Sequence, residues 1–92
     1  MKKSEMLNLV VGSIVKNKKG KWEIREIQFE VFEDGKYMYG SDKAESYKEV
    51  NEMTVGKERK KVIYFYLHNI DTTEETNKLL RESTIKNSFE IV

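Results

Sequence analysis

Cysteine and proline are absent from this 92-residue sequence, and histidine and tryptophan each occur once. Without cysteine the chain has no disulfide framework, no thiolate nucleophile and no cysteine-bound metal, which is consistent with a reducing compartment. The mostly apolar stretch from Met6 to Val15 is about half as long as a membrane-spanning helix, and Glu5 and Asn8 interrupt the pattern of a signal peptide. We therefore expect a cytoplasmic protein that does not associate with membranes.

Catalytic motifs are missing as well. The sequence contains no glycine-rich phosphate loop, no nucleophile elbow and no histidine–carboxylate cluster with metal-ligand spacing. His68 could act as a general acid or base if Asp71 oriented it, but a histidine at a strand end also commonly bonds a loop carbonyl. We predict a non-enzymatic protein without metal or cofactor, and keep an enzyme that relies on His68 as an alternative.

The composition is that of a folded domain with a heavily charged surface, since 38% of the residues are hydrophobic and 36% are charged. A chain of this length has room for one core, so we expect residues 1–92 to form a single binding domain. The formal net charge is +1, and any attraction to nucleic acid must come from local patches. The excess of lysine and glutamate resembles proteins of AT-rich genomes, including those of bacteriophages and mobile elements.

Alternation of apolar and polar residues predicts several β-strands. A β-branched run over residues 9–15 predicts a first strand, with a bend at Gly12-Ser13, and residues 17–20 have the composition of a turn. Residues 22–31 alternate with a slip of one position at Arg25-Glu26, which indicates a bulge. Asp34-Gly35 predicts a tight hairpin turn. Residues 62–67 are apolar or aromatic throughout, as in a central strand, and residues 89–91 predict a last strand.

Two segments favour helices. In residues 42–55, Asp42 with Glu45 resembles a capping box and apolar residues recur every three positions, although a loop remains an alternative. Residues 71–75 contain two further candidate caps, followed by Leu79 and Leu80 on one face of a second helix.

These elements predict an α+β fold, in which about five antiparallel strands and one or two short helices form a small β-barrel or a strongly curved sheet. The pattern Gly12-Ser13-Ile14-Val15 followed by Gly20-x-Trp22-x-Ile24 is similar to the first hairpin of SH3-like small barrels.

Aromatic and charged residues supply three candidate binding surfaces. An aromatic face would expose side chains for protein recognition or base stacking, unless a helix covers it. Its candidate residues are Trp22, Tyr37, Tyr39, Tyr64 and Tyr66. Two basic loops would form a phosphate-binding patch if they lay at the same end of the sheet. Otherwise their lysines would only keep the strand edges soluble. The first loop contains Lys16, Lys18, Lys19 and Lys21, and the second contains Lys57, Arg59, Lys60 and Lys61. Four acidic residues would form a stripe along one face of a helix: Asp42, Glu45, Glu49 and Glu52. The stripe could mimic nucleic-acid phosphates, or it would simply be a solvated helix face.

From these surfaces we predict a protein-binding module, of the kind that phage or mobile-element accessory proteins use to modulate or inhibit a larger host protein or nucleoprotein complex. A small-barrel nucleic-acid-binding protein that uses the lysine loops and the tyrosines is the second hypothesis. Small sheets also hide an exposed edge or aromatic face by self-association, so a homodimer is a further expectation.

Overall fold

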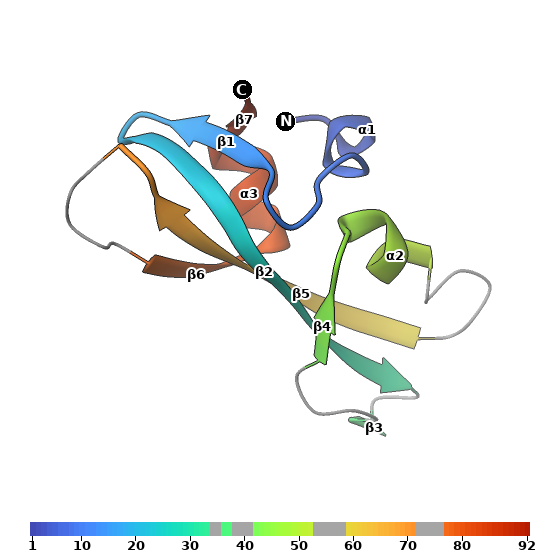
Figure 1. Ribbon diagram of the computed structural model, residues 1–92. Coiled ribbons are helices and arrows are strands. Elements are labelled where there is room, and N and C mark those ends of the chain that lie inside the picture. The colour runs from blue at the N-terminus through green and yellow to red at the C-terminus, as the bar shows by residue number, and fades with distance from the viewer. Residues whose placement is uncertain (34–35, 38–41, 53–58, 72–76) are drawn as a thin grey trace.

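The computed structural model describes residues 1–33, 36–37, 42–52, 59–71 and 77–92 (Figure 1). Within these residues there are three helices: α1 (Lys3–Met6), α2 (Tyr47–Glu52) and α3 (Glu82–Ser88). The described strands form one antiparallel sheet: β1 (Ile14–Asn17), β2 (Gly20–Glu33), β3 (Lys36–Tyr37), β4 (Asp42–Ala44), β5 (Arg59–Asn69), β6 (Asn77–Arg81) and β7 (Glu90–Ile91). The protein is therefore an α+β fold. In the described part of the chain, no helix is both long enough and apolar enough to cross a membrane.

The long strand β2 organises the sheet. One of its edges pairs with β5 from Trp22, opposite Asn69, to Glu33, opposite Arg59. The other edge is shared in succession by β1, β4 and β3. The strand order is β6-β5-β2-β1-β7, and no pairing among the described residues joins β6 to β7. The described strands thus form an open sheet and not a closed barrel.

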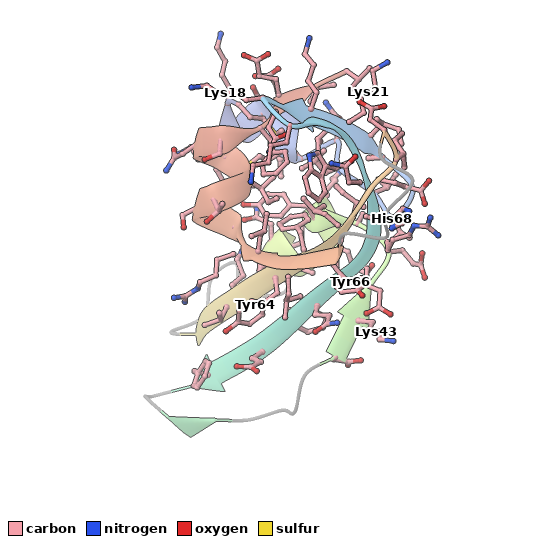
Figure 2. The ribbon with its side chains drawn as sticks, turned by 90° about the vertical axis from the view of Figure 1, so that its left-hand side faces the viewer. Lys18, Lys21, Lys43, Tyr64, Tyr66 and His68 are labelled. Atoms are coloured by element: carbon pink, nitrogen blue, oxygen red, sulfur yellow. The ribbon has the colours of Figure 1, made fainter. Side chains whose placement is uncertain are left out.

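A bulge in β2 explains the phase slip in its sequence. Its register against β5 shifts between Ile24, opposite Leu67, and Glu26, opposite Tyr66. The extra residue returns the strand to the same face, so that Ile24 and Ile27 are both completely buried. A bulge also bends a strand, and Figure 2 shows β2 curving through the molecule. The predicted bulge is confirmed.

The hydrophobic core lies on one side of the sheet, which we call the inner face. Every helix contributes to it, and α1 and α2 lie above β2 and β5 in Figure 1. Tyr47 of α2 stacks on Phe65 of β5 with ring centroids 6.1 Å apart, and Trp22 meets Phe89 edge-on at 6.2 Å. The buried residues of the three helices belong to the same cluster as those of the strands: Met6, Tyr47, Val50 and Ile85.

The two predicted hairpins are confirmed by strand pairing. In the first, Asn17 lies opposite Gly20, and the Asn17 side chain accepts a hydrogen bond from the Lys19 amide at 2.9 Å. In the second, Glu33 lies opposite Lys36, which leaves two residues for the turn. Those two residues, Asp34-Gly35, lie outside the described part of the chain.

The first predicted strand begins later than expected. β1 starts at Ile14, whereas Leu9 is buried in the core and Val10 makes an isolated bridge with Ser46. Gly12 has φ of +97°, and its amide bonds the Ile24 carbonyl at 2.7 Å. The bend expected at this glycine is present, and it separates the buried N-terminal segment from the strand.

The short helix predicted within residues 42–55 is confirmed in part, because α2 occupies Tyr47–Glu52, but the segment is not helical from its start. Its first residues form β4, because the middle of β2 offers a free edge between β1 and β3. α2 begins at Tyr47, where Ser46 Oγ accepts the Glu49 amide at 3.1 Å and the Glu49 carboxylate accepts the Glu45 amide at 3.3 Å. The capping group is therefore Ser46 and not Asp42. Residues 53–55 lie outside the described part.

The predicted helix through Leu79 and Leu80 is wrong, because these residues form β6 along the edge of β5. Of the two candidate caps, Asp71 instead accepts a hydrogen bond from the Lys21 amide at 2.8 Å, and the one at residues 72–75 lies outside the described residues. The helix that follows, α3, begins at Glu82 and buries Ile85. The expected last strand is confirmed as β7, with Phe89 buried just before it.

Candidate functional site

The side of the sheet opposite the core, which we call the outer face, carries the tyrosines of β5. Ile63, Phe65 and Leu67 are buried on the inner face, and so the alternating residues Tyr64 and Tyr66 lie on the outer face. Both tyrosines are partly buried, and Figure 2 shows them near β6 and β2. Because the buried residues of all three described helices join the core, these helices cover the inner face only.

Charged groups from β2 and β4 lie beside the tyrosines. Glu26 is opposite Tyr66 in the register, and its carboxylate accepts hydrogen bonds from Gln28 Nε2 at 2.7 Å and from Lys43 Nζ at 3.0 Å. The hydrogen bond from Gln28, followed by that from Lys43, lowers the pKa of Glu26. The carboxylate is therefore ionised at neutral pH and is already oriented.

β6 borders the tyrosines on their other side. Arg81 is opposite Tyr64, and its guanidinium lies 6.0 Å from the centroid of the Tyr64 ring, within the range of a cation–π contact. Leu79 is opposite Tyr66 and is 51% exposed. We call this group the tyrosine face, and it consists of Glu26, Lys43, Tyr64, Tyr66, Leu79 and Arg81.

The other three aromatic candidates are not placed on the tyrosine face by the described residues. Trp22 is 1% exposed on the inner face, where it packs on Phe89 and donates a hydrogen bond from Nε1 to Asn17 Oδ1 at 2.8 Å. Trp22 is thus a core residue and not part of an exposed aromatic surface. Tyr37 belongs to β3 at the far end of β2, but its side chain is outside the described part, as is the whole of Tyr39.

The described residues of the two basic loops lie at opposite ends of the sheet. The first is the β1–β2 hairpin, whose lysines are all exposed: Lys16, Lys18, Lys19 and Lys21. The hairpin adjoins the end of β5, whereas the second cluster is at the start of β5. At roughly 3.3 Å per residue, the length of β5 separates them by about 30 Å. The geometric condition for one combined basic patch is therefore not met.

Lys61 of the second cluster has a structural contact. It shares the inner face with Ile63, and its Nζ donates to the carbonyl of Asn51 at 3.3 Å and to Asn51 Oδ1 at 2.9 Å. Burial lowers the pKa of Lys61. A cation near the C-terminal end of α2 is favourable, so this lysine connects α2 to β5. Lys57 and the side chains of Arg59 and Lys60 lie outside the described part.

The acidic candidates do not share one helix face. Asp42 is in β4 and Glu45 precedes α2, whereas Glu49 and Glu52 are in the helix. All four are exposed. The Glu49 carboxylate is occupied by the Glu45 amide. The residues are neighbours along the chain, but the regular stripe that was expected is absent.

His68 lies on the outer face, opposite Glu23 in the register. Asp71, the carboxylate proposed to orient it, accepts a hydrogen bond from the Lys21 amide at 2.8 Å, while its own amide bonds Asn69 Oδ1 at 2.9 Å. Asp71 therefore connects the end of β5 to the β1–β2 hairpin. In the described ranges, no group of three or more His, Asp or Glu residues is arranged to hold a metal ion.

Four members of the tyrosine face were not predicted as binding residues: Glu26, Lys43, Leu79 and Arg81. The last three come from segments that were expected to be helical, so their positions beside β2 or β5 could not be deduced. No family model, curated protein or solved structure matches this chain. The function must therefore be inferred from the geometry alone.

Proposed function

We propose that this protein is a non-enzymatic protein-binding module that contacts its partner through the tyrosine face. The observation that supports this proposal is the position of Tyr64 and Tyr66 on the side of the sheet away from the three described helices. Tyrosine and arginine are enriched among the residues that dominate interface energetics. Here Arg81 lies against Tyr64, and exposed Leu79 adds apolar area beside Tyr66.

The charges on this face favour a protein partner with polar groups of both signs. The face contains the Glu26 carboxylate, which is paired with Lys43, and the cationic Arg81. A central aromatic and apolar area with polar groups around it is the usual organisation of a protein–protein interface. The compositional likeness to phage and mobile-element proteins suggests that the partner is a larger host protein or nucleoprotein complex, which the module would modulate or inhibit.

A nucleic-acid ligand has less support. That hypothesis combined the tyrosines with two lysine loops, but the loops lie at opposite ends of β5, and Lys61 bonds Asn51. The β1–β2 hairpin alone offers a small cluster of exposed lysines. Any binding through so few charges would weaken steeply between about 50 and 200 mM salt.

The test compares two double variants with the wild-type protein. Tyr64→Ala with Tyr66→Ala alters the tyrosine face, and Lys18→Glu with Lys21→Glu is the control on the exposed hairpin. Immobilised proteins are incubated with lysate from the source cells, and the affinity of each recovered partner is measured by surface plasmon resonance. Circular dichroism verifies that each variant is folded.

We expect the wild type and the hairpin variant to retain the same partner, and the tyrosine variant to bind it at least about 30-fold more weakly, as is typical of an interface hot spot. Unchanged affinity of the tyrosine variant would refute the proposed surface. Tight, salt-sensitive binding of labelled oligonucleotides that is lost only in the hairpin variant would instead favour nucleic acid.

A further inference from the structure

Strand β6 forms a border of the sheet. Among the described residues it pairs only with β5, and its other edge has no strand beside it. In Figure 1 it lies below β5, on the side away from α1 and α2. An unpaired strand edge presents backbone N–H and C=O groups that can pair with another strand. Leu79, at the middle of β6, is 51% exposed.

We propose that a second copy of this chain pairs with β6, so that two β6 strands run antiparallel about a two-fold axis at Leu79. Only this register pairs all five residues of β6 with all five of the second copy. It places Leu79 opposite the partner's Leu79, Arg81 opposite Asn77, and Lys78 opposite Leu80. No two like charges face each other, and like charges directly opposite would be destabilising.

The side chains on the outer face support the same register. Leu79 is opposite Tyr66 on β5, so pairing at Leu79 creates a row across four strands: Tyr66, Leu79, the partner's Leu79 and the partner's Tyr66. Cross-strand apolar and aromatic neighbours stabilise a sheet. The two-fold axis is perpendicular to the sheet, and both tyrosine faces therefore lie on the same side of the dimer.

The dimer is expected to be weak. A five-residue edge buries less surface than a standard protein interface, so we expect a Kd on the order of 10–100 µM. The proposal does not rest on the proposed function, because pairing is through the backbone edge of β6, although Leu79 of that strand also belongs to the tyrosine face. A partner protein could bind the tyrosine faces of either a monomer or a dimer.

Sedimentation equilibrium of four proteins tests the proposal: the wild type, Leu79→Lys, Leu79→Glu and the control Ile91→Lys. Ile91 is 39% exposed and lies in β7 at the other end of the sheet. In the proposed register each Leu79 variant places like charges opposite each other. We therefore expect both variants to be monomers and Ile91→Lys to dimerise like the wild type.

The decisive sample is an equimolar mixture of Leu79→Lys and Leu79→Glu. Lysine then faces glutamate at the two-fold axis, so the mixture should dimerise at least as strongly as the wild type. A mixture that stays monomeric would refute the register. A wild type that is monomeric up to about 1 mM, or Leu79 variants that dimerise normally, would refute the proposal as a whole.

Discussion

Substituting Gly20 by alanine should destabilise the protein by about 1–2 kcal/mol more than the same change at Gly12. Both glycines have positive φ, +126° at Gly20 and +97° at Gly12, which L-residues rarely adopt. Their surroundings differ. A Cβ at Gly12 would meet no atom within 4 Å, whereas one at Gly20 would lie 2.7 Å from Asp71 Oδ2 and 3.1 Å from Asp71 Cβ. Gly12→Ala therefore measures backbone strain alone.

The magnitudes can be worked out from these contacts. Backbone strain should cost about 1–3 kcal/mol at either glycine. At Gly20 the Asp71 carboxylate must also move, and it accepts the Lys21 amide at 2.8 Å. Losing that bond should add about 1–2 kcal/mol, for a total of roughly 2–5 kcal/mol. For a domain of this size, each kcal/mol lowers Tm by about 4–8 °C.

Urea denaturation of five proteins provides the measurement: the wild type, Gly12→Ala, Gly20→Ala, Asp71→Ala and the double variant Gly20→Ala with Asp71→Ala. Alanine at position 71 removes the carboxylate, and with it both the 2.7 Å contact and the bond to the Lys21 amide, while its Cβ remains. The double variant should therefore be at least about 1 kcal/mol more stable than the sum of the single changes implies. Strict additivity, or a Gly20→Ala variant no less stable than Gly12→Ala, would refute the reasoning.

Three further predictions concern Tyr47, the cap of α2 and Trp22. Burial, the charge of Glu82 and a hydrogen bond to Glu82 raise the pKa of Tyr47 to about 12. Above pH 10 the Tyr47 hydroxyl therefore keeps its proton in the folded state but loses it in the unfolded state. Stability should therefore fall by about 1.4 kcal/mol between pH 9 and 11. Tyr47→Phe should remove that part of the pH dependence, and an unchanged slope would contradict the prediction. Ser46→Ala removes the cap of α2 and should cost about 1 kcal/mol in urea denaturation, compared with about zero for exposed Ser88→Ala. Trp22 is 1% exposed, so its fluorescence should shift to longer wavelength on unfolding; native emission already at the wavelength of free tryptophan would disprove its burial.

The local patterns in the sequence predicted the strands that alternate clearly. The phase slip in residues 22–31 identified the bulge. Residues three apart in a regular strand lie on opposite faces, so one extra residue is needed to place both Ile24 and Ile27 on the inner face. The hairpin turns were also recognisable from their residue types. These features depend on neighbours within a few residues, which the sequence shows directly.

The errors came from interactions between distant segments. Leu79 and Leu80 are adjacent, which suits a helix or a strand, and the deciding factor is the free edge of β5. In the same way, the residue type of Trp22 suggested an exposed aromatic, although its alternation with Ile24 places it in the core. Lys61 was grouped with neighbouring cations, yet its place in the alternation puts it on the inner face beside α2. Strand register decides each of these outcomes.

The division of one edge of β2 among three strands has a consequence for how the chain folds. Only two residues separate β2 from β1 and from β3 in the sequence, and β4 follows closely, so one side of β2 can assemble from local contacts. The opposite side requires β5, which is distant in the sequence, and loop closure makes such contacts slow to form. Docking of β5 should therefore limit the folding rate, with β6 and α3 joining afterwards. Substitutions at the β2–β5 seam would then slow folding, whereas substitutions in α3 would mainly accelerate unfolding.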